Sequence, residues 1–310
     1  DVVATGICGS DVHGAVGDTG RREVGQVMGH ETVGRVVEVG PDVDEAFVGR
    51  VAAVDPVMYC DDCLNCRSGV QQHCENGWVL GVRPDYDGAY ADRLLVPARN
   101  LVLLPDEMTA WHGALIEPLA VGFHAAVRGN ASPLDRVLIL GGGPIGQAVA
   151  FGCRRLGVRE IVVSEPDLQR GALIEFLGFT HITPERLGTD AEGERAGWAS
   201  LVFDVVGTDR TLASALQCSA RMARIVLVGM DAPIVSLPSY AVSAGERTIV
   251  GTICSTRRDY METAGWVAAN PSVVEAMVDA HEALEDGPQV FERILGGVSR
   301  ANKVLLHPSL

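Results

Sequence analysis

The sequence predicts an α/β protein of two domains, one a doubly wound parallel sheet and the other small and β-rich. The chain has 310 residues, more than a single hydrophobic core usually organises. A glycine-rich motif lies between a buried strand and a helix at 136–156. Four closely spaced cysteines lie among short strand-like segments in the first third of the chain. Together these observations predict a nucleotide-binding domain and a second domain that holds a metal.

Composition and charge exclude several classes of partner. The chain is 47% hydrophobic, and its 25 basic and 40 acidic residues give a net charge of −15. Without any run of Lys or Arg, neither nucleic acid nor an anionic membrane is expected to bind. We also find no apolar run of membrane-spanning length and no signal peptide, so we expect a cytoplasmic protein. Of its eight cysteines, four lie within fifteen residues, and in a reducing compartment such spacing favours metal binding over disulfides.

The glycine-rich motif carries the signature of a dinucleotide site. The apolar run Val137–Leu140 predicts a strand buried on both faces. Gly141, Gly143 and Gly146 then fit G-x-G-x-x-G, which provides a tight turn and a close backbone approach to a pyrophosphate. Pro144 suits the first turn of the helix that follows.

A second strand at Ile161–Ser164 leads to Glu165, 19 residues past Gly146, where an acidic group accepts hydrogen bonds from the adenosine ribose. The plain alternative is a glycine-rich turn without a ligand. The order of strand, motif, helix, strand and acid favours the nucleotide site. Further strands at Leu201–Gly207 and Arg224–Gly229 end in glycine, where a cofactor can pass over the sheet.

The spacing C-x2-C-x2-C-x7-C is the most specific local pattern in the chain. It places four thiolates in one loop, enough for a closed tetrahedral zinc site that leaves no position for substrate. The four residues are Cys60, Cys63, Cys66 and Cys74. An iron–sulfur cluster is the alternative that cysteine spacing leaves open. A nucleic-acid-binding zinc ribbon would need basic neighbours, whereas this loop carries Asp61, Asp62 and Glu75.

A second group of candidate metal ligands is more dispersed. Cys8 and His30 are residue types that bind zinc, and Ser10 places a hydroxyl two residues after Cys8. Taken alone, each residue is better explained without a metal, Cys8 as a small buried hydrophobe and His30 as a hydrogen-bonded core histidine. Glu117 is a carboxylate in an apolar run, costly to bury unless something binds it. It also suits the first turn of a helix, where the dipole favours an acid.

The rest of the chain shows strand and helix patterns without repeats or long linkers. Strands are expected at 34–39, 48–54, 88–97, 100–104, 248–253 and 303–306. Helices are expected to begin near Leu115, to cover Leu212–Met222, and to recur in the tail at 266–269, 273–278 and 291–295.

Five motifs in order resemble the zinc-dependent medium-chain dehydrogenase/reductase superfamily, and within it the polyol, butanediol and threonine dehydrogenase branch. The motifs are GICGSDVH at 6–13, GHETVG at 29–34, the four cysteines at 60–74, IEPLAV at 116–121 and GGGPIG at 141–146. The resemblance covers 6–306. It implies a Rossmann domain at 123–260, a GroES-like catalytic domain at 1–122 that includes the zinc lobe at 60–74, and a C-terminal part at 261–310 that returns to the catalytic domain.

The resemblance also implies roles for individual residues and two zinc ions per chain. A catalytic zinc would be held by Cys8, His30 and Glu117, with Glu31 beside it or exchanging with bound water. Ser10 and His13 match the family's proton relay, and the four-cysteine loop would hold the structural zinc. The implied cofactor residues are Gly141, Gly143, Pro144, Ile145, Gly146, Glu165, Arg170, Val206 and Gly229.

The expected reaction is hydride transfer between NAD and a secondary alcohol, namely a polyol, vicinal diol or hydroxy-amino acid, or the matching ketone. Glu165 would repel a ribose 2′-phosphate and so favours NAD, although Arg170, five residues on, offsets this preference. The alternatives are an NADPH-dependent carbonyl reductase on the same fold and a catalytically silent nucleotide-binding relative. A homodimer or homotetramer is expected. Relatives carry roughly thirty further N-terminal residues and a longer region after Trp266, so we expect a preceding N-terminal segment in the native protein.

Overall fold

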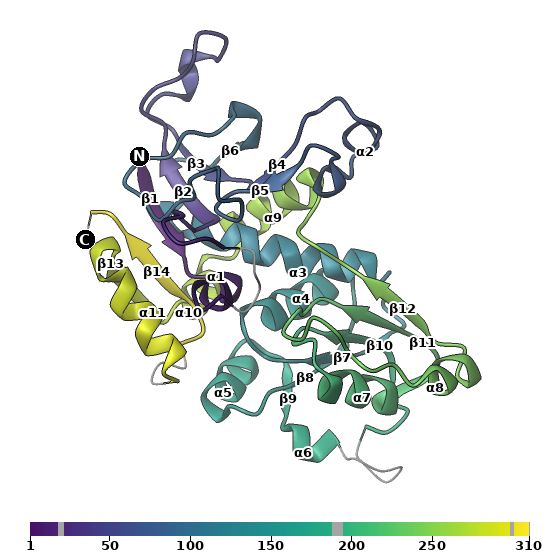
Figure 1. Cartoon of the computed structure of the whole chain (residues 1–310). Coiled ribbons are helices and arrows are strands. Elements are labelled where there is room, and N and C mark those ends of the chain that lie inside the picture. Colours follow the sequence, from purple (N-terminus) through teal and green to yellow (C-terminus); the bar gives the residue numbers. More distant parts are fainter. Residues whose placement is uncertain (18–21, 188–194, 298–300, 310) are drawn as a thin grey trace. The chain divides into compact units, whose positions relative to one another are not determined.

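The computed structural model describes residues 1–17, 22–187, 195–297 and 301–309. Two compact units make up the chain (Figure 1). One comprises Asp1–Pro118 and Ser255–Leu310, and the other comprises Leu119–Cys254. Helix α3 (Ile116–Arg128) spans the first boundary.

The middle unit is built on a six-stranded parallel sheet in the order β12-β11-β10-β7-β8-β9. Its strands are β7 (Arg136–Leu140), β8 (Glu160–Ser164), β9 (Thr180–Ile182), β10 (Ala199–Asp204), β11 (Ser219–Leu227) and β12 (Thr248–Gly251). From β7 the order runs outward in one direction through β8 and β9 and in the other through β10 to β12. The direction in which successive strands are added therefore reverses between β7 and β10. A doubly wound fold binds its ligand at this point.

Helices connect these parallel strands, as is usual for the crossovers that parallel pairing needs. They are α4 (Pro144–Arg155), α5 (Leu168–Phe176), α6 (Pro184–Leu187), α7 (Asp209–Cys218) and α8 (Ser239–Ala244). The middles of the central strands are apolar because both faces are covered, and Val137, Leu138 and Ile139 have no exposed surface. The predicted doubly wound parallel sheet is confirmed.

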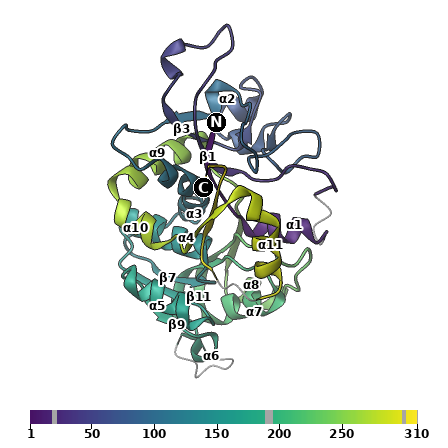
Figure 2. The same ribbon diagram turned by 90° about the vertical axis from the view of Figure 1, so that its left-hand side faces the viewer.

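The other unit contains a six-stranded sheet in the order β13-β14-β1-β2-β3-β6. Its strands are β1 (Val2–Gly6), β2 (Glu31–Arg35), β3 (Val51–Val54), β6 (Leu101–Leu103), β13 (Ala280–Ala283) and β14 (Val304–His307). The neighbours from β14 to β6 pair antiparallel, and β13 pairs parallel to β14. Strand β14 lies beside β1, which brings the two ends of the chain near each other in both views (Figures 1 and 2). The predicted β-rich domain is confirmed.

Short helices complete this unit. They are α1 (Gly9–Ala15), α2 (Leu64–Arg67), α9 (Arg257–Ala269), α10 (Pro271–Ala276) and α11 (Gly287–Leu295). Within the described residues, 3-10 segments lie at Glu45–Phe47, Gln71–His73, Ala98–Asn100, Ala110–Leu115 and Leu284–Asp286. The cysteine loop lies between β4 (Val57–Met58) and β5 (Trp78–Val79), which pair with each other. Side chains from α1, α11 and β14 share one apolar cluster with Ile7.

Some expected elements differ from those observed. The predicted strand at 88–97 is wrong: Gly88, Ala89 and Tyr90 donate their backbone N–H groups to residues 27–29 instead, and Leu95 is 96% exposed. The helix expected at Leu212–Met222 ends at Cys218, and the next four residues open β11. The strand expected at 34–39 is displaced toward the N-terminus, as β2.

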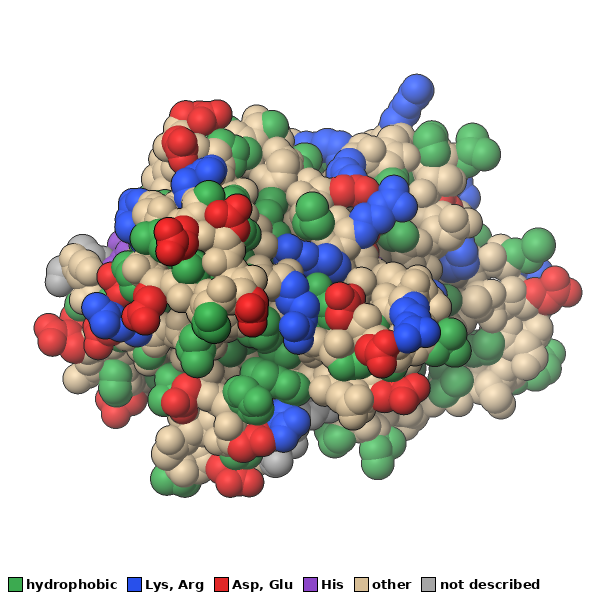
Figure 3. Space-filling view, turned by 90° about the horizontal axis from the view of Figure 1, so that it is seen from above, with side chains coloured by type: hydrophobic (Ala, Val, Ile, Leu, Met, Phe, Trp, Pro, Cys, Tyr) green, Lys and Arg blue, Asp and Glu red, His purple; other side chains and the backbone are tan. Residues whose placement is uncertain are grey.

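The charged side chains on the surface are distributed as the sequence, without runs of Lys or Arg, leads one to expect. On the face drawn in Figure 3, acidic and basic side chains are intermixed and form no continuous basic stripe. Within the described ranges, none of the helices has the length and apolar character needed to cross a membrane.

Candidate functional site

Cys8, His30 and Glu31 form a group of potential metal ligands in the first unit. Their ligand atoms all lie within 4.8 Å of one another. Pairing of Gly6 with Glu31 between β1 and β2 brings them together, because Cys8 follows β1 as the N-cap of α1 and His30 immediately precedes β2. His30 and Glu31 are 5% and 1% exposed, so the group is largely removed from water.

The donor set fits a zinc ion. Sulfur, imidazole nitrogen and carboxylate oxygen are the atoms that zinc binds in catalytic sites. Burial, followed by the charges of Glu31 and Asp11, raises the pKa of the Cys8 thiol to about 12. A bound cation would favour the thiolate, as it does at any coordinating thiol.

Lys303 supplies a buried positive charge beside this group. Its ammonium donates to both carboxylate oxygens of Glu31, at 2.8 and 2.6 Å, and to the Ile7 carbonyl at 3.1 Å. Burial lowers the pKa of Lys303, but the charges of Glu31 and Cys8 outweigh it and the net shift is upward. Lys303 is the only lysine in the 310 residues, a sequence signal that our motif analysis missed.

Asp11 is a second residue that the motif analysis did not assign. It is fully buried on α1, and its Oδ2 lies 3.5 Å from His30 Nδ1. The imidazole therefore turns its Nδ1 edge toward the carboxylate. Metal-bound histidines generally present their other nitrogen to such a carboxylate.

Ser10 and His13 are exposed residues of α1, two and five positions after Cys8. The Ser10 hydroxyl donates to Cys8 Sγ at 3.3 Å. Glu117 lies in the first turn of α3 and is not part of the group whose ligand atoms fall within 4.8 Å. Burial raises the pKa of Glu117 to about 8, the charge of His30 lowers it, and the charges of Glu31 and Cys8 raise it. The structure thus brings Cys8, His30 and Glu31 together. Glu117 lies outside this group but close enough for its charges to shift the pKa of Glu117.

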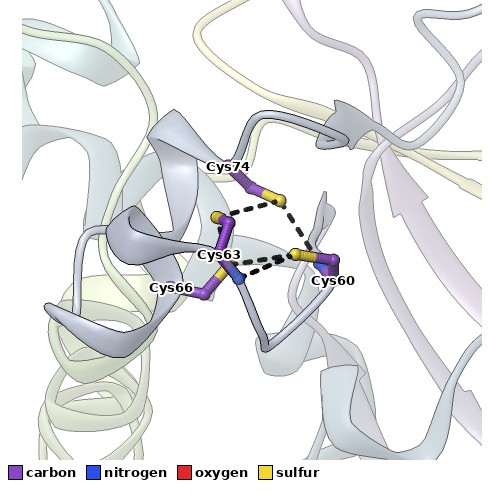
Figure 4. Close-up of side chains that lie close together, drawn as sticks. All are labelled: Cys60, Cys63, Cys66 and Cys74. Carbon is purple, nitrogen blue, oxygen red and sulfur yellow. Dashed lines mark hydrogen bonds between the residues drawn. The ribbon is translucent and has the colours of Figure 1, made fainter.

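Cys60, Cys63, Cys66 and Cys74 form the second group, and all four are free thiols (Figure 4). Three sulfur pairs are separated by 3.5 to 3.9 Å. Ligand sulfurs in a tetrahedral zinc site with Zn–S near 2.3 Å are roughly 3.8 Å apart. Backbone N–H groups of Asp62 and Cys63 lower the pKa of Cys60 to about 6. The spacing and the donated hydrogen bonds fit a closed zinc site.

The glycine motif of the middle unit forms a turn between β7 and α4. Gly141 has φ +104°, a value that favours glycine, and a Cβ on Gly146 would lie 2.0 Å from the Gly141 carbonyl oxygen. No atom lies within 4 Å of a Cβ built on Gly143, so the turn is open at that point. Pro144 and Ile145 begin α4. The lack of space for a side chain at Gly146 and the open space at Gly143 fit a turn whose backbone a pyrophosphate approaches closely.

The remaining predicted cofactor residues lie at the carboxyl ends of neighbouring strands. Glu165 follows β8 and accepts the Gly142 N–H at 2.8 Å and the Asp167 N–H at 2.9 Å. A Cβ on Gly141 would contact Val206, and one on Gly229 would overlap the Val206 backbone. Arg170 lies farther on, in the first turn of α5, and its N–H bonds to Asp167. The carboxyl ends of the strands, where dinucleotides bind, therefore carry the glycine motif, Glu165, Val206 and Gly229.

Comparison with known proteins gives two matching family models. Residues 1–106 match the alcohol dehydrogenase GroES-like domain, and residues 144–269 match the zinc-binding dehydrogenase family. The chain is 30% identical to 2-dehydro-3-deoxy-L-galactonate 5-dehydrogenase of Pseudoalteromonas atlantica, over 96% of this chain and 87% of that protein. It is 34% identical to L-idonate 5-dehydrogenase of Vitis vinifera, over 81% of this chain and 71% of that protein.

Two solved structures extend the likeness to cofactor-bound proteins. One is a putative zinc-binding dehydrogenase from Sinorhizobium meliloti bound to NADP, with a TM-score of 0.89, 25% identity, and coverage of 99% of this chain and 90% of that one. The other is an alcohol dehydrogenase from Escherichia coli complexed with NADH, with a TM-score of 0.88 and the same identity and coverage.

Proposed function

We propose a function from the premise that this chain belongs to the zinc-dependent medium-chain dehydrogenase/reductase family and is an alcohol oxidoreductase. In this proposal it transfers a hydride between NAD and a secondary alcohol of a polyol or polyhydroxy acid. The observation that carries the proposal is the buried group of Cys8, His30 and Glu31, which joins three zinc-binding side chains beside a serine hydroxyl. The names of the two relatives, both sugar-acid dehydrogenases, support the substrate class.

In this proposal Cys8 and His30 hold the catalytic zinc, and Glu117 completes the site directly or through water. Glu31 lies beside them or exchanges with bound water, with Lys303 balancing its charge. A zinc ion held there supplies a Lewis acid that lowers the pKa of a substrate hydroxyl. Ser10 accepts the proton of that hydroxyl as it releases its own towards the exposed His13, which passes a proton to solvent.

The four-cysteine group holds a second zinc with a structural role. A tetrahedral site with four thiolates has no open position, so it cannot bind substrate. The experiment that tests the assignment compares Cys8→Ser and His30→Ala with the wild type. Turnover is expected to disappear while NADH binding, followed by fluorescence, survives. Full activity in either variant would refute the proposal, and activity absent even from wild type would favour a silent relative.

NAD is the proposed cofactor, and Glu165 is the reason. Its carboxylate lies beside Gly142 at the edge of the sheet, where a ribose 2′-phosphate would meet a negative charge. Rates with NAD and NADP, measured on wild type and on Glu165→Ala, test the preference. We expect wild type to favour NAD and the variant to lose part of that preference. A wild type that prefers NADPH and reduces carbonyls would instead support the reductase alternative.

We further propose a homo-oligomer, a dimer or a tetramer. Strand β12 is an edge of its sheet within the described chain, and exposed edges invite pairing with a second chain. Large apolar side chains are exposed in the segments around it: Met230, Ile234, Leu237, Tyr240 and Ile253. Light scattering should give a mass of two or four chains, and Ile234→Asp combined with Tyr240→Asp should lower it. A monomeric wild type would exclude the oligomer.

A further inference from the structure

Tyr90 connects the chain segments that carry the candidate zinc ligands. Its hydroxyl donates to Asp11 Oδ2 at 2.9 Å and also lies 3.3 Å from the carbonyl oxygen of Gly6, the last residue of β1. Its backbone N–H donates to Met28 at 2.9 Å. The Tyr90 side chain therefore contacts both the end of β1, which precedes Cys8, and helix α1, which follows it. The Tyr90 backbone bonds to the segment that leads to His30.

The fit between Tyr90 and that segment is tight. Gly29, the residue before His30, has φ +99°, and a Cβ there would lie 2.8 Å from Tyr90 Cδ1. On another side the ring makes an edge contact with Phe291 of α11, with 5.9 Å between centroids and 82° between planes. The ring is therefore packed on two sides, so its hydroxyl oxygen cannot be displaced far without moving the backbone beside His30.

Two donors hold the buried carboxylate of Asp11. Arg22 Nη2 donates to Oδ1 at 2.9 Å, and Tyr90 donates to Oδ2. With each oxygen tied to a separate partner, the carboxylate plane is set, and Oδ2 is kept 3.5 Å from His30 Nδ1. Burial, followed by the charge of Asp11, raises the pKa of Tyr90 well above 10, so its hydroxyl remains a donor.

We propose that Tyr90 and Arg22 are positioning residues for the metal at the Cys8–His30–Glu31 group. They hold Asp11 so that its carboxylate orients the His30 imidazole and leaves Nε2 directed toward the metal. The inference rests on the proposed function, because it requires that a metal bind there. Both residues act through Asp11, with which each forms a hydrogen bond.

A purely structural role for the Tyr90 hydroxyl predicts a different outcome from a positioning role. Loss of a structural hydrogen bond lowers stability and leaves metal affinity unchanged. Loss of a partner behind a metal-bound histidine weakens metal affinity by roughly 10- to 100-fold. Metal affinity is therefore the deciding measurement, and it does not depend on turnover.

The test uses Tyr90→Phe, which keeps the ring and its contact with Phe291. After a chelator removes the catalytic metal and leaves the four-cysteine zinc in place, Co²⁺ is titrated against a competing chelator and followed by thiolate-to-cobalt absorption. We expect Tyr90→Phe to bind Co²⁺ about 10- to 100-fold more weakly than wild type. Tyr260→Phe is the matched control, because it also removes one tyrosine hydroxyl, which donates to the Val54 carbonyl at 2.8 Å and not to Asp11. It should bind Co²⁺ as wild type does.

A double-mutant cycle with Asp11→Asn tests whether Tyr90 acts through Asp11. We expect Tyr90→Phe to have little further effect in the Asp11→Asn background. Additive losses would overturn the inference, as would wild-type Co²⁺ affinity in Tyr90→Phe. A wild-type chain that takes up no Co²⁺ outside the four-cysteine site would overturn the proposed function as well, so the two failures are distinguishable.

Discussion

The ammonium of Lys303 lies 2.6 Å from the Glu31 carboxylate, although the two residues are 272 positions apart. Both side chains are almost fully buried. The contact exists because β14, near the C-terminus, pairs with β1, which also pairs with β2. Lys303, the residue immediately before β14, therefore balances the charge of a ligand group whose members, Cys8, His30 and Glu31, all come from the first 31 residues.

Removing Lys303 should destabilise the protein far more than removing an exposed cation. In Lys303→Met the Glu31 charge stays buried without its partner, a change that typically costs 3–5 kcal/mol. Arg293→Met is the control, because Arg293 pairs with Glu282 at 2.6 Å but is 44% exposed, and such pairs contribute about 1 kcal/mol or less. The measurement is the free energy of unfolding in urea.

A second substitution separates charge from packing. Adding Glu31→Gln to Lys303→Met removes the unpaired charge, so the double variant should recover part of the lost stability. Equal stability of Lys303→Met and wild type would mean that the pair makes no net contribution.

Two glycines of the nucleotide turn should respond differently to alanine. In Gly146→Ala the new methyl group would lie 2.0 Å from the Gly141 oxygen, so the middle unit should lose about 1–3 kcal/mol of stability. In Gly143→Ala the methyl group meets nothing within 4 Å, so the melting temperature should stay close to that of wild type. Its NADH affinity should nevertheless fall, because the methyl group lies where the pyrophosphate approaches. Unchanged NADH binding in Gly143→Ala would show that the cofactor does not approach this residue.

These positions also show how far sequence reasoning reached. The strand before the glycine turn was expected at Val137–Leu140 and is observed as β7 (Arg136–Leu140), because a strand covered on both faces has a distinctive apolar run. The segment at 88–97 alternates like a strand but forms none, since its backbone bonds to a loop that local sequence does not reveal. Pairs such as Lys303 with Glu31 depend on strand order, which no local pattern encodes.

The two metal groups should be separable by zinc analysis. Wild type should contain about two zinc ions per chain, and Cys66→Ser and Cys8→Ser about one each. Only Cys66→Ser should lower the melting temperature markedly, because the four-cysteine group holds a loop and metal binding there contributes directly to folding. Cys153→Ala, which alters a buried cysteine outside both groups, should keep both ions.

The same zinc analysis tests Glu117. Glu117→Ala should lose the catalytic zinc if Glu117 binds or supports it. One zinc ion per chain both in wild type and in Glu117→Ala would mean that the catalytic site takes none.

Stability should fall as pH rises through the range in which Asp55 ionises. Burial raises the pKa of this 1%-exposed carboxyl from 3.8 to about 6, opposed by Arg257 and the Val57 N–H. Between these values the folded chain binds the proton and the unfolded chain does not, so the free energy of unfolding decreases with pH, by up to about 3 kcal/mol from this group. Asp55→Asn should remove that slope in urea titrations between about pH 4 and 7, whereas Asp62→Asn, which alters an 83%-exposed side chain, should retain it. Parallel curves for wild type and Asp55→Asn would show that Asp55 is already ionised in the folded protein, held in that form by Arg257.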